Sequence, residues 1–155
     1  MTIPLSHHPL SHHPHPLEEA INRIRQGEAL VISNRHRGAL IVCKPYCCQF
    51  LGPGSILGGE IDRSCTRLVP IGKLSLTSPS NADELYRAYL IRRQWTLNTH
   101  RLTELPNPTD RAQQFLNQLE NYFSPEIIRR VPPEDLASIV GVFPRTMLQV
   151  LNRSH

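Results

Sequence analysis

Residues 133–153, "PEDLASIVGVFPRTMLQVLNR", decide the fold of the C-terminal part of the chain. Two short helical segments flank Gly141, and glycine adopts the positive φ of a sharp turn without steric cost. Ala137 is the small residue that lets the second segment cross close to the first. Pro144 suits the first turn of a helix, where its missing N–H costs no hydrogen bond. The positions that must be apolar to join the helices hold Leu136, Val140, Val142, Met147 and Val150. The spacing predicts a helix-turn-helix, with a generic helical hairpin as the alternative.

The outward face of the second helix decides whether it can read DNA. Arginine, glutamine and asparagine side chains can hydrogen-bond guanine and adenine edges, and threonine can contact a phosphate. Leu148 lies on the same face and offers no hydrogen bond, and Phe143 and Pro144 precede it. The face therefore predicts altered or weakened DNA contact. The expected DNA-binding residues are Arg145, Thr146, Gln149, Asn152 and Arg153.

Length and charge set the limits on function. The 155 residues suffice for one domain with a core or for two small ones, and the formal net charge is +4. Residues 81–155 hold nine Lys and Arg against eight Asp and Glu, so a basic face there needs local placement of arginines. No stretch approaches the ~20 apolar residues of a membrane span, and no signal-peptide pattern is present. We expect a cytoplasmic protein with reduced thiols and no membrane partner.

The first 16 residues contain the imperfect repeat "PLSHHPLSHHPHP". Proline and histidine exclude regular helix and bury little, so residues 1–16 are predicted to be a disordered tail. The tail is either a weak metal-binding tract or, as its composition favours, a solubilising segment. Its histidines are His7, His8, His12, His13 and His15.

Residues 17–80 read as a small β domain behind a short helix. Residues 17–26 place apolar side chains at helical spacing, and Gly27 ends them. Residues 28–78 hold four or five short runs rich in Val, Ile and Leu, separated by turn residues. This pattern predicts a small barrel or sandwich.

Residues 81–105 contain no Pro or Gly and predict a long amphipathic helix. Its apolar stripe follows a 3-4 spacing that is interrupted at Arg92 and Thr99. A helix with one such stripe commonly pairs with its twin, so we predict dimerisation, with packing on the chain's own β domain as the alternative. The stripe consists of Leu85, Ala88, Trp95, Leu102 and Leu105. Residues 106–155 form the predicted helix-turn-helix domain, which begins with a helix over 109–123.

Three stretches, in this order, resemble the Crp/Fnr family of bacterial transcription regulators. "FLGPGSILGGE" (50–60) is similar to the glycine-rich turn of the family's sensor barrel. The predicted helices over 81–105 and 109–123 are similar to the family's dimerisation helix and first DNA-domain helix. Residues 134–153 are similar to its helix-turn-helix. The resemblance implies an α+β fold with a shortened, jelly-roll-like β-barrel over 17–80, a long dimerisation helix and a C-terminal helix-turn-helix domain. It also implies a homodimeric transcription regulator that binds duplex DNA.

The resemblance extends to a degenerate effector cassette made of Gly59, Glu60, Arg63 and Ser64. In the family, the Glu of this cassette accepts from a ribose hydroxyl and the Arg pairs with a cyclic phosphate. The family places a loop and a short helix between the two pairs, whereas only Ile61 and Asp62 separate them here. We therefore expect no cyclic nucleotide and no other cofactor.

The recognition helix also departs from the family pattern. The family has Arg-Glu at its start and Ser-Arg one turn later, where this chain has Pro144-Arg145 and Leu148-Gln149. Only Arg145 keeps a charge that can reach a base, and it is shifted by one position.

The four cysteines leave several interpretations open. Cys43, Cys47, Cys48 and Cys65 can form a metal or iron–sulfur site, sense redox state or be buried structural thiols. Their spacing lacks the paired C-x2-C of common zinc sites, and adjacent strand residues such as Cys47 and Cys48 point to opposite faces. We expect buried thiols and no metal. No catalytic motif is present, so the chain is not expected to be an enzyme.

Two functions remain. One is a Crp/Fnr-like regulator that binds DNA through its helix-turn-helix. The other is an adaptor that binds a protein partner, a regulator or part of the transcription machinery, through Phe143, Leu148 and Leu151 or through Trp95. Salt dependence separates them, because only DNA binding weakens steeply with added salt.

Overall fold

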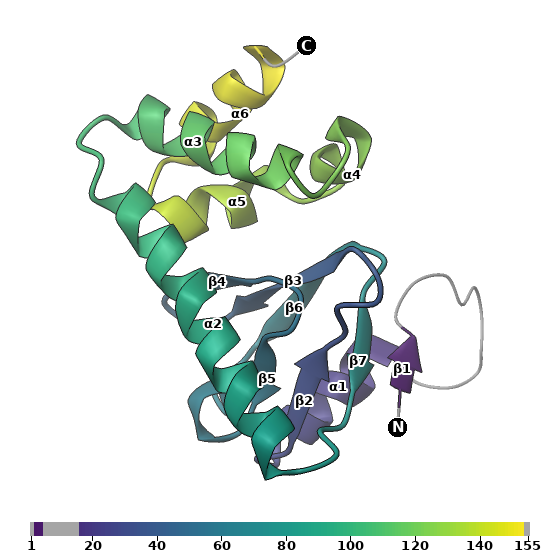
Figure 1. Ribbon diagram of the computed structural model, residues 1–155. Coiled ribbons are helices and arrows are strands. Elements are labelled where there is room, and N and C mark those ends of the chain that lie inside the picture. The colour runs from purple at the N-terminus through teal and green to yellow at the C-terminus, as the bar shows by residue number, and fades with distance from the viewer. Residues whose placement is uncertain (1, 5–15, 154–155) are drawn as a thin grey trace.

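The computed structural model describes residues 2–4 and 16–153 and arranges them as two sheets and a layer of helices (Figure 1). Sheet A has the strand order β1 (Thr2–Pro4), β7 (Ser75–Thr77), β2 (Ala29–Ile32) and β5 (Ile56–Gly58). Sheet B has the order β4 (Cys48–Leu51), β3 (Gly38–Cys43) and β6 (Arg67–Gly72). All their pairings are antiparallel. The helices are α1 (Pro16–Arg25), α2 (Ala82–Thr103), α3 (Pro108–Glu120), α4 (Pro125–Arg129), α5 (Pro133–Val140) and α6 (Pro144–Arg153), with one 3-10 turn, η1 (Glu60–Asp62).

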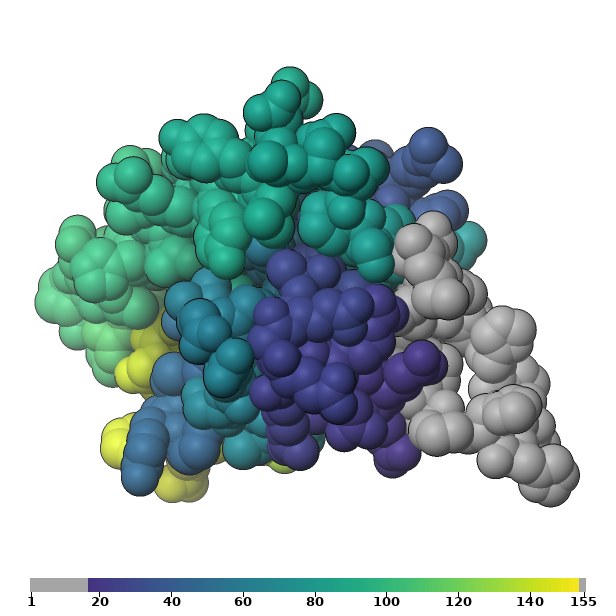
Figure 2. Space-filling model, turned by 90° about the horizontal axis from the view of Figure 1, so that it is seen from below, coloured from purple at the N-terminus to yellow at the C-terminus, as the bar shows by residue number. Residues whose placement is uncertain are grey.

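The sequence predicted a small barrel or a sandwich over residues 17–80, and of these the barrel is not formed, because both sheets are open. Within the described residues, no strand joins sheet A to sheet B, and the sheets share one apolar core instead. Leu30 and Leu57 enter this core from sheet A, and Leu40 and Leu51 enter it from sheet B. Helix α1 adds Ala20 and Ile24 to the same core. Figure 2, which views the molecule from below, shows α1 in dark purple near the middle of this face and α2 in teal along its upper margin.

Strand β3 is buried on both faces, which explains its unbroken apolar sequence "GALIVC". Alternate side chains of a strand point to opposite faces. Leu40 and Val42 point into the core between the sheets, and Ile41 and Cys43 point toward the helices. Sheet B is therefore the middle layer, with sheet A on one side and the C-terminal helices on the other.

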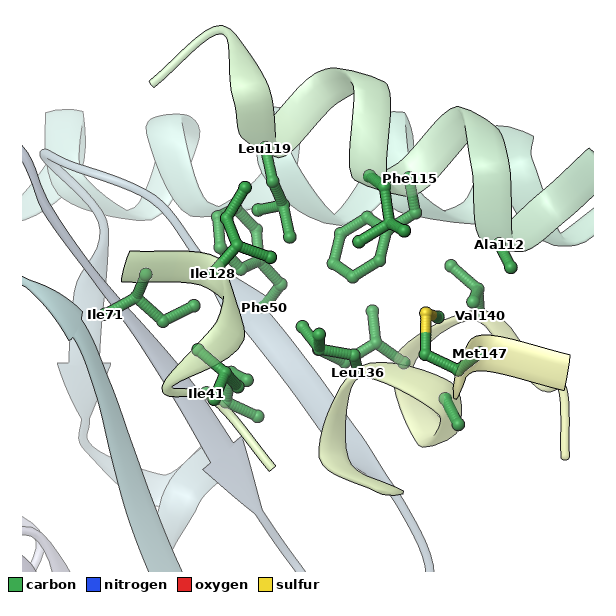
Figure 3. Close-up of a cluster of buried hydrophobic side chains, with 14 of the residues drawn as sticks. Ile41, Phe50, Ile71, Ala112, Phe115, Leu119, Ile128, Leu136, Val140 and Met147 are labelled. Carbon is green, nitrogen blue, oxygen red and sulfur yellow. The ribbon is translucent and has the colours of Figure 1, made fainter. Parts of the chain in front are cut away.

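The core between sheet B and the helices is continuous. Figure 3 shows Phe115 of α3, Leu136 of α5 and Met147 of α6 converging with Phe50 and Ile71 of sheet B. Ile128 brings α4 into the same cluster. The predicted helix-turn-helix region thus shares one core with the β region.

Helix α2 begins at a capped N-terminus. The side chain of Asn81 accepts a hydrogen bond from the backbone N–H of Glu84, and acidic residues occupy the first turn. Its first half packs on the outer face of sheet A, where Ala88 meets Val31 and Ile56. Its second half packs on sheet B and α3, where Trp95 lies against Phe50 with ring centroids 5.6 Å apart. The helix therefore covers one flank of both sheets.

The stripe predicted for dimerisation faces the chain's own sheets and helices, so the structure favours the alternative stated for it. Ala88 and Leu102 are buried within the chain. The remaining members, Leu85, Trp95 and Leu105, are half-buried and pack against the apolar clusters. The two interruptions are filled: Arg92 is buried and ion-paired, and the hydroxyl of Thr99 donates to the Trp95 carbonyl. The stripe therefore packs within the chain.

At the N-terminus the structure differs from the predicted tail. Thr2–Pro4 forms strand β1 and pairs with β7. Residues 5–15, with the five tail histidines, lie outside the described residues. The predicted helix over 17–26 is α1, which ends before Gly27, whose φ is 90°.

Candidate nucleic-acid interface

The turn between α5 and α6 is built around Gly141. Its φ and ψ are 66° and 41°, the left-handed region that glycine enters most readily. Arg111 of α3 holds the turn from outside by donating to the carbonyls of Val140 at 3.1 Å and Gly141 at 3.2 Å. The same guanidinium donates to the Leu105 carbonyl at 2.7 Å. Sequence reasoning missed Arg111, because no local pattern marks an arginine whose acceptors are distant carbonyls.

Most of the residues predicted to join the two helices are at most 1% exposed: Leu136, Ala137, Val140, Met147 and Val150. Val142 is half-buried and packs against the same core. They fix the inner face of α6 against α3 and α5, and the opposite face is thereby turned to solvent.

The outer face of α6 carries the residues proposed to contact DNA. Arg145, Gln149 and Asn152 are exposed at spacings of four and three, which place them on one side of the helix. Arg153 is also exposed, and Thr146 is half-buried. Helix α6 contains no carboxylate, and within the described residues neither of its arginines forms an ion pair. The face is therefore cationic and has unused hydrogen-bond donors.

Two large apolar side chains interrupt this polar face. Phe143 is 80% exposed just before α6, and Leu148 is 45% exposed between Arg145 and Gln149. Leu151 is half-buried and packs against the helical core. The structure therefore brings together polar and apolar contact groups on one surface.

Helix α5 is anchored to sheet B by an ion pair. The guanidinium of Arg67 on β6 donates twice to the carboxylate of Asp135, at 2.9 and 2.5 Å. The hydrogen bond to Asp135 raises the pKa of Arg67 above its usual value. Asp135 lies in the first turn of α5 and is buried. Sequence analysis did not find this pair, because 68 positions separate its members.

The residues of the degenerate cassette lie around η1. Glu60 and Arg63 form an ion pair of 2.9 Å with each other, and both side chains are largely exposed. Gly59 precedes the 3-10 turn with a φ of 69°, and Ser64 is exposed beyond it. The two charged groups therefore neutralise one another at the surface.

The buried group of this segment is Asp62, which sequence analysis passed over as a spacer. Its carboxylate accepts from Arg92 at 2.6 and 3.0 Å and from the Gly58 N–H at 2.7 Å, and Lys44 lies 3.3 Å away. Burial would raise the pKa of Asp62, but the Arg92 hydrogen bond and charge, with Gly58 and Lys44, outweigh it and hold that pKa below its usual value. Arg92 also donates to the Gln49 side chain at 2.9 Å. This network ties α2 to both sheets.

The four cysteines do not gather into one site. Cys47 is exposed, whereas Cys65 is buried and its thiol donates to the Arg67 carbonyl at 3.5 Å. Cys43 and Cys48 lie side by side with Asp135 nearby, and among the described residues they form the one group of three potential metal ligands. A four-thiolate centre is therefore not formed.

Comparison with known proteins gives a distant likeness. Neither a scan against protein-family models nor a search of curated proteins found a match. A solved structure of CprK complexed with OCPA is similar with a TM-score of 0.42 and 15% identity, over 82% of this chain and 69% of that chain. This likeness is too slight to assign a family. None of the helices within residues 16–153 combines the length and hydropathy that crossing a bilayer requires.

Proposed function

We propose that the protein is a DNA-binding transcription regulator of the Crp/Fnr-like type, which acts as a homodimer and uses no cyclic nucleotide. The observation that carries the proposal is the outer face of α6. It presents arginine, glutamine and asparagine side chains without a carboxylate, on a helix whose inner face is locked into the core.

The dimensions and chemistry of α6 suit a major groove. A helix of ten residues is roughly 15 Å long and enters a groove about 12 Å wide. Arg145 would donate to a guanine edge, and Gln149 and Asn152 would pair with adenine edges. Thr146 and Arg153 would contact phosphates. Because the inner face of α6 is packed, these side chains approach DNA as one rigid set.

We place the homodimer on the outer face of α2, in place of the stripe that the chain itself covers. Tyr86, Leu90, Arg93 and Leu97 follow spacings of four, three and four, as the seam of a coiled coil does. Tyr86 is 64%, Leu90 45% and Leu97 41% exposed, so three large apolar groups lie on a helix face that the chain leaves uncovered. A parallel pair of α2 helices would present two α6 helices to half-sites about one helical turn, ~34 Å, apart.

The geometry of η1 supports the part of the proposal that excludes a cyclic nucleotide. Glu60 and Arg63 are paired with each other, so neither is free to hold a ribose hydroxyl or a phosphate. Between them, Asp62 is buried and accepts a hydrogen bond from Arg92.

A second function is favoured by one observation, the exposure of Phe143 and Leu148 beside the polar groups. Aromatic side chains are enriched in protein–protein contacts, and Leu148 would extend the apolar surface around Phe143. An adaptor would use them to bind a regulator or a component of the transcription machinery.

The deciding experiment is a fluorescence-anisotropy titration of mixed-sequence duplex DNA at 50 and 200 mM salt, with the mass in solution measured on the same sample. We expect salt-sensitive binding by a dimer. Arg145→Ala should weaken it several-fold, whereas Arg35→Ala, which removes an equal charge from an exposed loop, should change it little. Absence of binding at low salt, or equal loss in both variants, would contradict the placement of α6 on DNA and favour the adaptor.

A further inference from the structure

Cys43 and Cys48 lie opposite each other in a tight hairpin. Cys43 ends β3 and Cys48 begins β4, and the two are direct partners in the register. The Lys44 N–H donates to the Cys47 carbonyl at 2.8 Å and closes the hairpin. Hydrogen-bonded and non-hydrogen-bonded pairs alternate along antiparallel strands, so the next pair, Cys43 and Cys48, is of the non-hydrogen-bonded type. Side chains approach most closely in such pairs.

The two sulfur atoms are 2.8 Å apart. A disulfide bond measures about 2.04 Å, so the sulfurs need to close by roughly 0.8 Å. The Cα atoms of a non-hydrogen-bonded pair stand about 4.5 Å apart, within the span that disulfides accept. Bond formation therefore needs side-chain rotation and no rearrangement of the strands.

We propose that Cys43 and Cys48 form a reversible intrachain disulfide, made by a hydroperoxide and reduced by a thiol. Cys48 is the thiol that reacts first. It is half-buried and lines a cleft of about 150 Å³ with Phe50 and His100, through which a small peroxide can reach it. Cys43 is 4% exposed, and burial is the main reason that its pKa is raised to about 12.

The reaction balances in two steps. The Cys48 thiol attacks the peroxide oxygen, the O–O bond breaks, and the products are a Cys48 sulfenic acid and an alcohol, or water from hydrogen peroxide. The Cys43 sulfur then displaces the hydroxyl group from Cys48, with loss of one water, and the S–S bond forms. The peroxide gains the two electrons that the thiols lose.

The same three groups could hold a metal, but the geometry favours the disulfide. Both oxygens of Asp135 already accept hydrogen bonds from Arg67, and a metal cation would sit close to that guanidinium. Thiolates at 2.3 Å from a tetrahedral zinc lie roughly 3.8 Å apart, so the sulfurs would have to separate. Forming the disulfide therefore requires a smaller movement of the two sulfur atoms than binding zinc does.

The disulfide would act on the DNA-binding face, a step that rests on the proposed function. The Cys43 sulfur lies 4.0 Å from the Asp135 carboxylate and is oriented to donate to it. Oxidation removes the thiol proton of Cys43, so Asp135, which anchors the first turn of α5, loses this hydrogen-bond donor. We therefore expect oxidation to shift DNA affinity by roughly five-fold or more.

The test uses the full chain, reduced and then treated with hydrogen peroxide. Thiol titration in denaturant should fall from four free thiols to two. Chymotryptic cleavage after Tyr46, which is 99% exposed, separates Cys43 from Cys48, so a disulfide keeps the two peptides joined until reductant is added. Performing the digest on Cys47→Ser assigns the bond to Cys48. Cys43→Ser and Cys48→Ser should abolish the bond, whereas Cys65→Ser and Cys47→Ser should retain it.

A bond that includes Cys47 or Cys65, a bond between chains, or zinc that co-purifies in a one-to-one ratio and blocks oxidation would overturn the proposal. The DNA titration is then repeated on reduced and oxidised protein. Unchanged affinity with a confirmed disulfide would refute the link to α5. If the reduced protein binds no DNA, the proposed function fails, while the thiol count still decides the chemistry of the pair.

Discussion

Arg67 on β6 and Asp135 on α5 meet through two parallel hydrogen bonds, at 2.9 and 2.5 Å, and so join the middle sheet to the helix that carries the turn. The Asp135 side chain is 4% exposed, whereas that of Arg67 is 52% exposed. The pair therefore orients α5 at the edge of the shared core, and α6 follows because its inner face packs on α5. The position of the proposed DNA-contacting face depends on this contact as well as on the local turn.

Replacing Arg67 with alanine should destabilise the fold by about 2 kcal/mol, because it leaves the buried Asp135 without its charged donor. Arg63→Ala is the matched control. It breaks an exposed pair with Glu60 and should cost no more than about 0.5 kcal/mol. The measurement is urea unfolding followed by the fluorescence of Trp95, the single tryptophan. Equal losses in the two variants would show that the pair does not anchor α5.

Asp62→Asn should be the more severe change, at about 3–5 kcal/mol near neutral pH, because it leaves Arg92 buried without a carboxylate. The folded-state pKa of Asp62 is lowered, so its contribution to stability is present above the unfolded pKa of about 4 and is lost as pH falls through the folded value. The difference between wild type and variant should therefore shrink in acid. Glu60→Gln, two residues away and exposed, should show neither the loss nor this pH dependence.

Gly141→Ala should cost about 1 kcal/mol, because alanine is strained at a φ of 66°. An added Cβ would meet no atom within 4 Å, so strain alone acts and no neighbour has to move. Gly141→Asn should lose less stability than Gly141→Ala, since asparagine adopts the left-handed region more readily than alanine does. Thermal unfolding of the three proteins checks the order, and an alanine variant as stable as wild type would rule out the left-handed turn.

Leu97→Glu should dissociate the proposed dimer, because it puts a charge into the seam on the outer face of α2. Thr96→Glu is the control, since it places the same charge on the flank of the same helix. Mass measured by light scattering should halve only for the Leu97 variant. A protein that is monomeric before any substitution would refute the seam and, with it, the two-fold reading of DNA.

Several features of the fold follow from local sequence. Residue types at short spacing determine the turn at Gly141 and the buried faces of α5 and α6. The capped start of α2 and the end of α1 before Gly27 also depend on neighbouring residues. Strand β5 was missed inside "FLGPGSILGGE", because three residues among glycines carry no detectable period. Arg92 interrupts the apolar stripe of α2 in the sequence. It is buried there because its guanidinium forms an ion pair with Asp62, which comes from a different segment.

By itself, the sequence determined the long helices and most of the strands, where the sharp turn lies and which side chains of α6 point outward. These properties depend on residues within one or two turns of each other. Only the tertiary structure decided that the sheets stay open, that the Leu85-to-Leu105 stripe covers its own core and that Asp135 meets the Cys43–Cys48 hairpin. Such contacts join residues tens of positions apart, and their free energy comes from burial and charge pairing that no local pattern encodes.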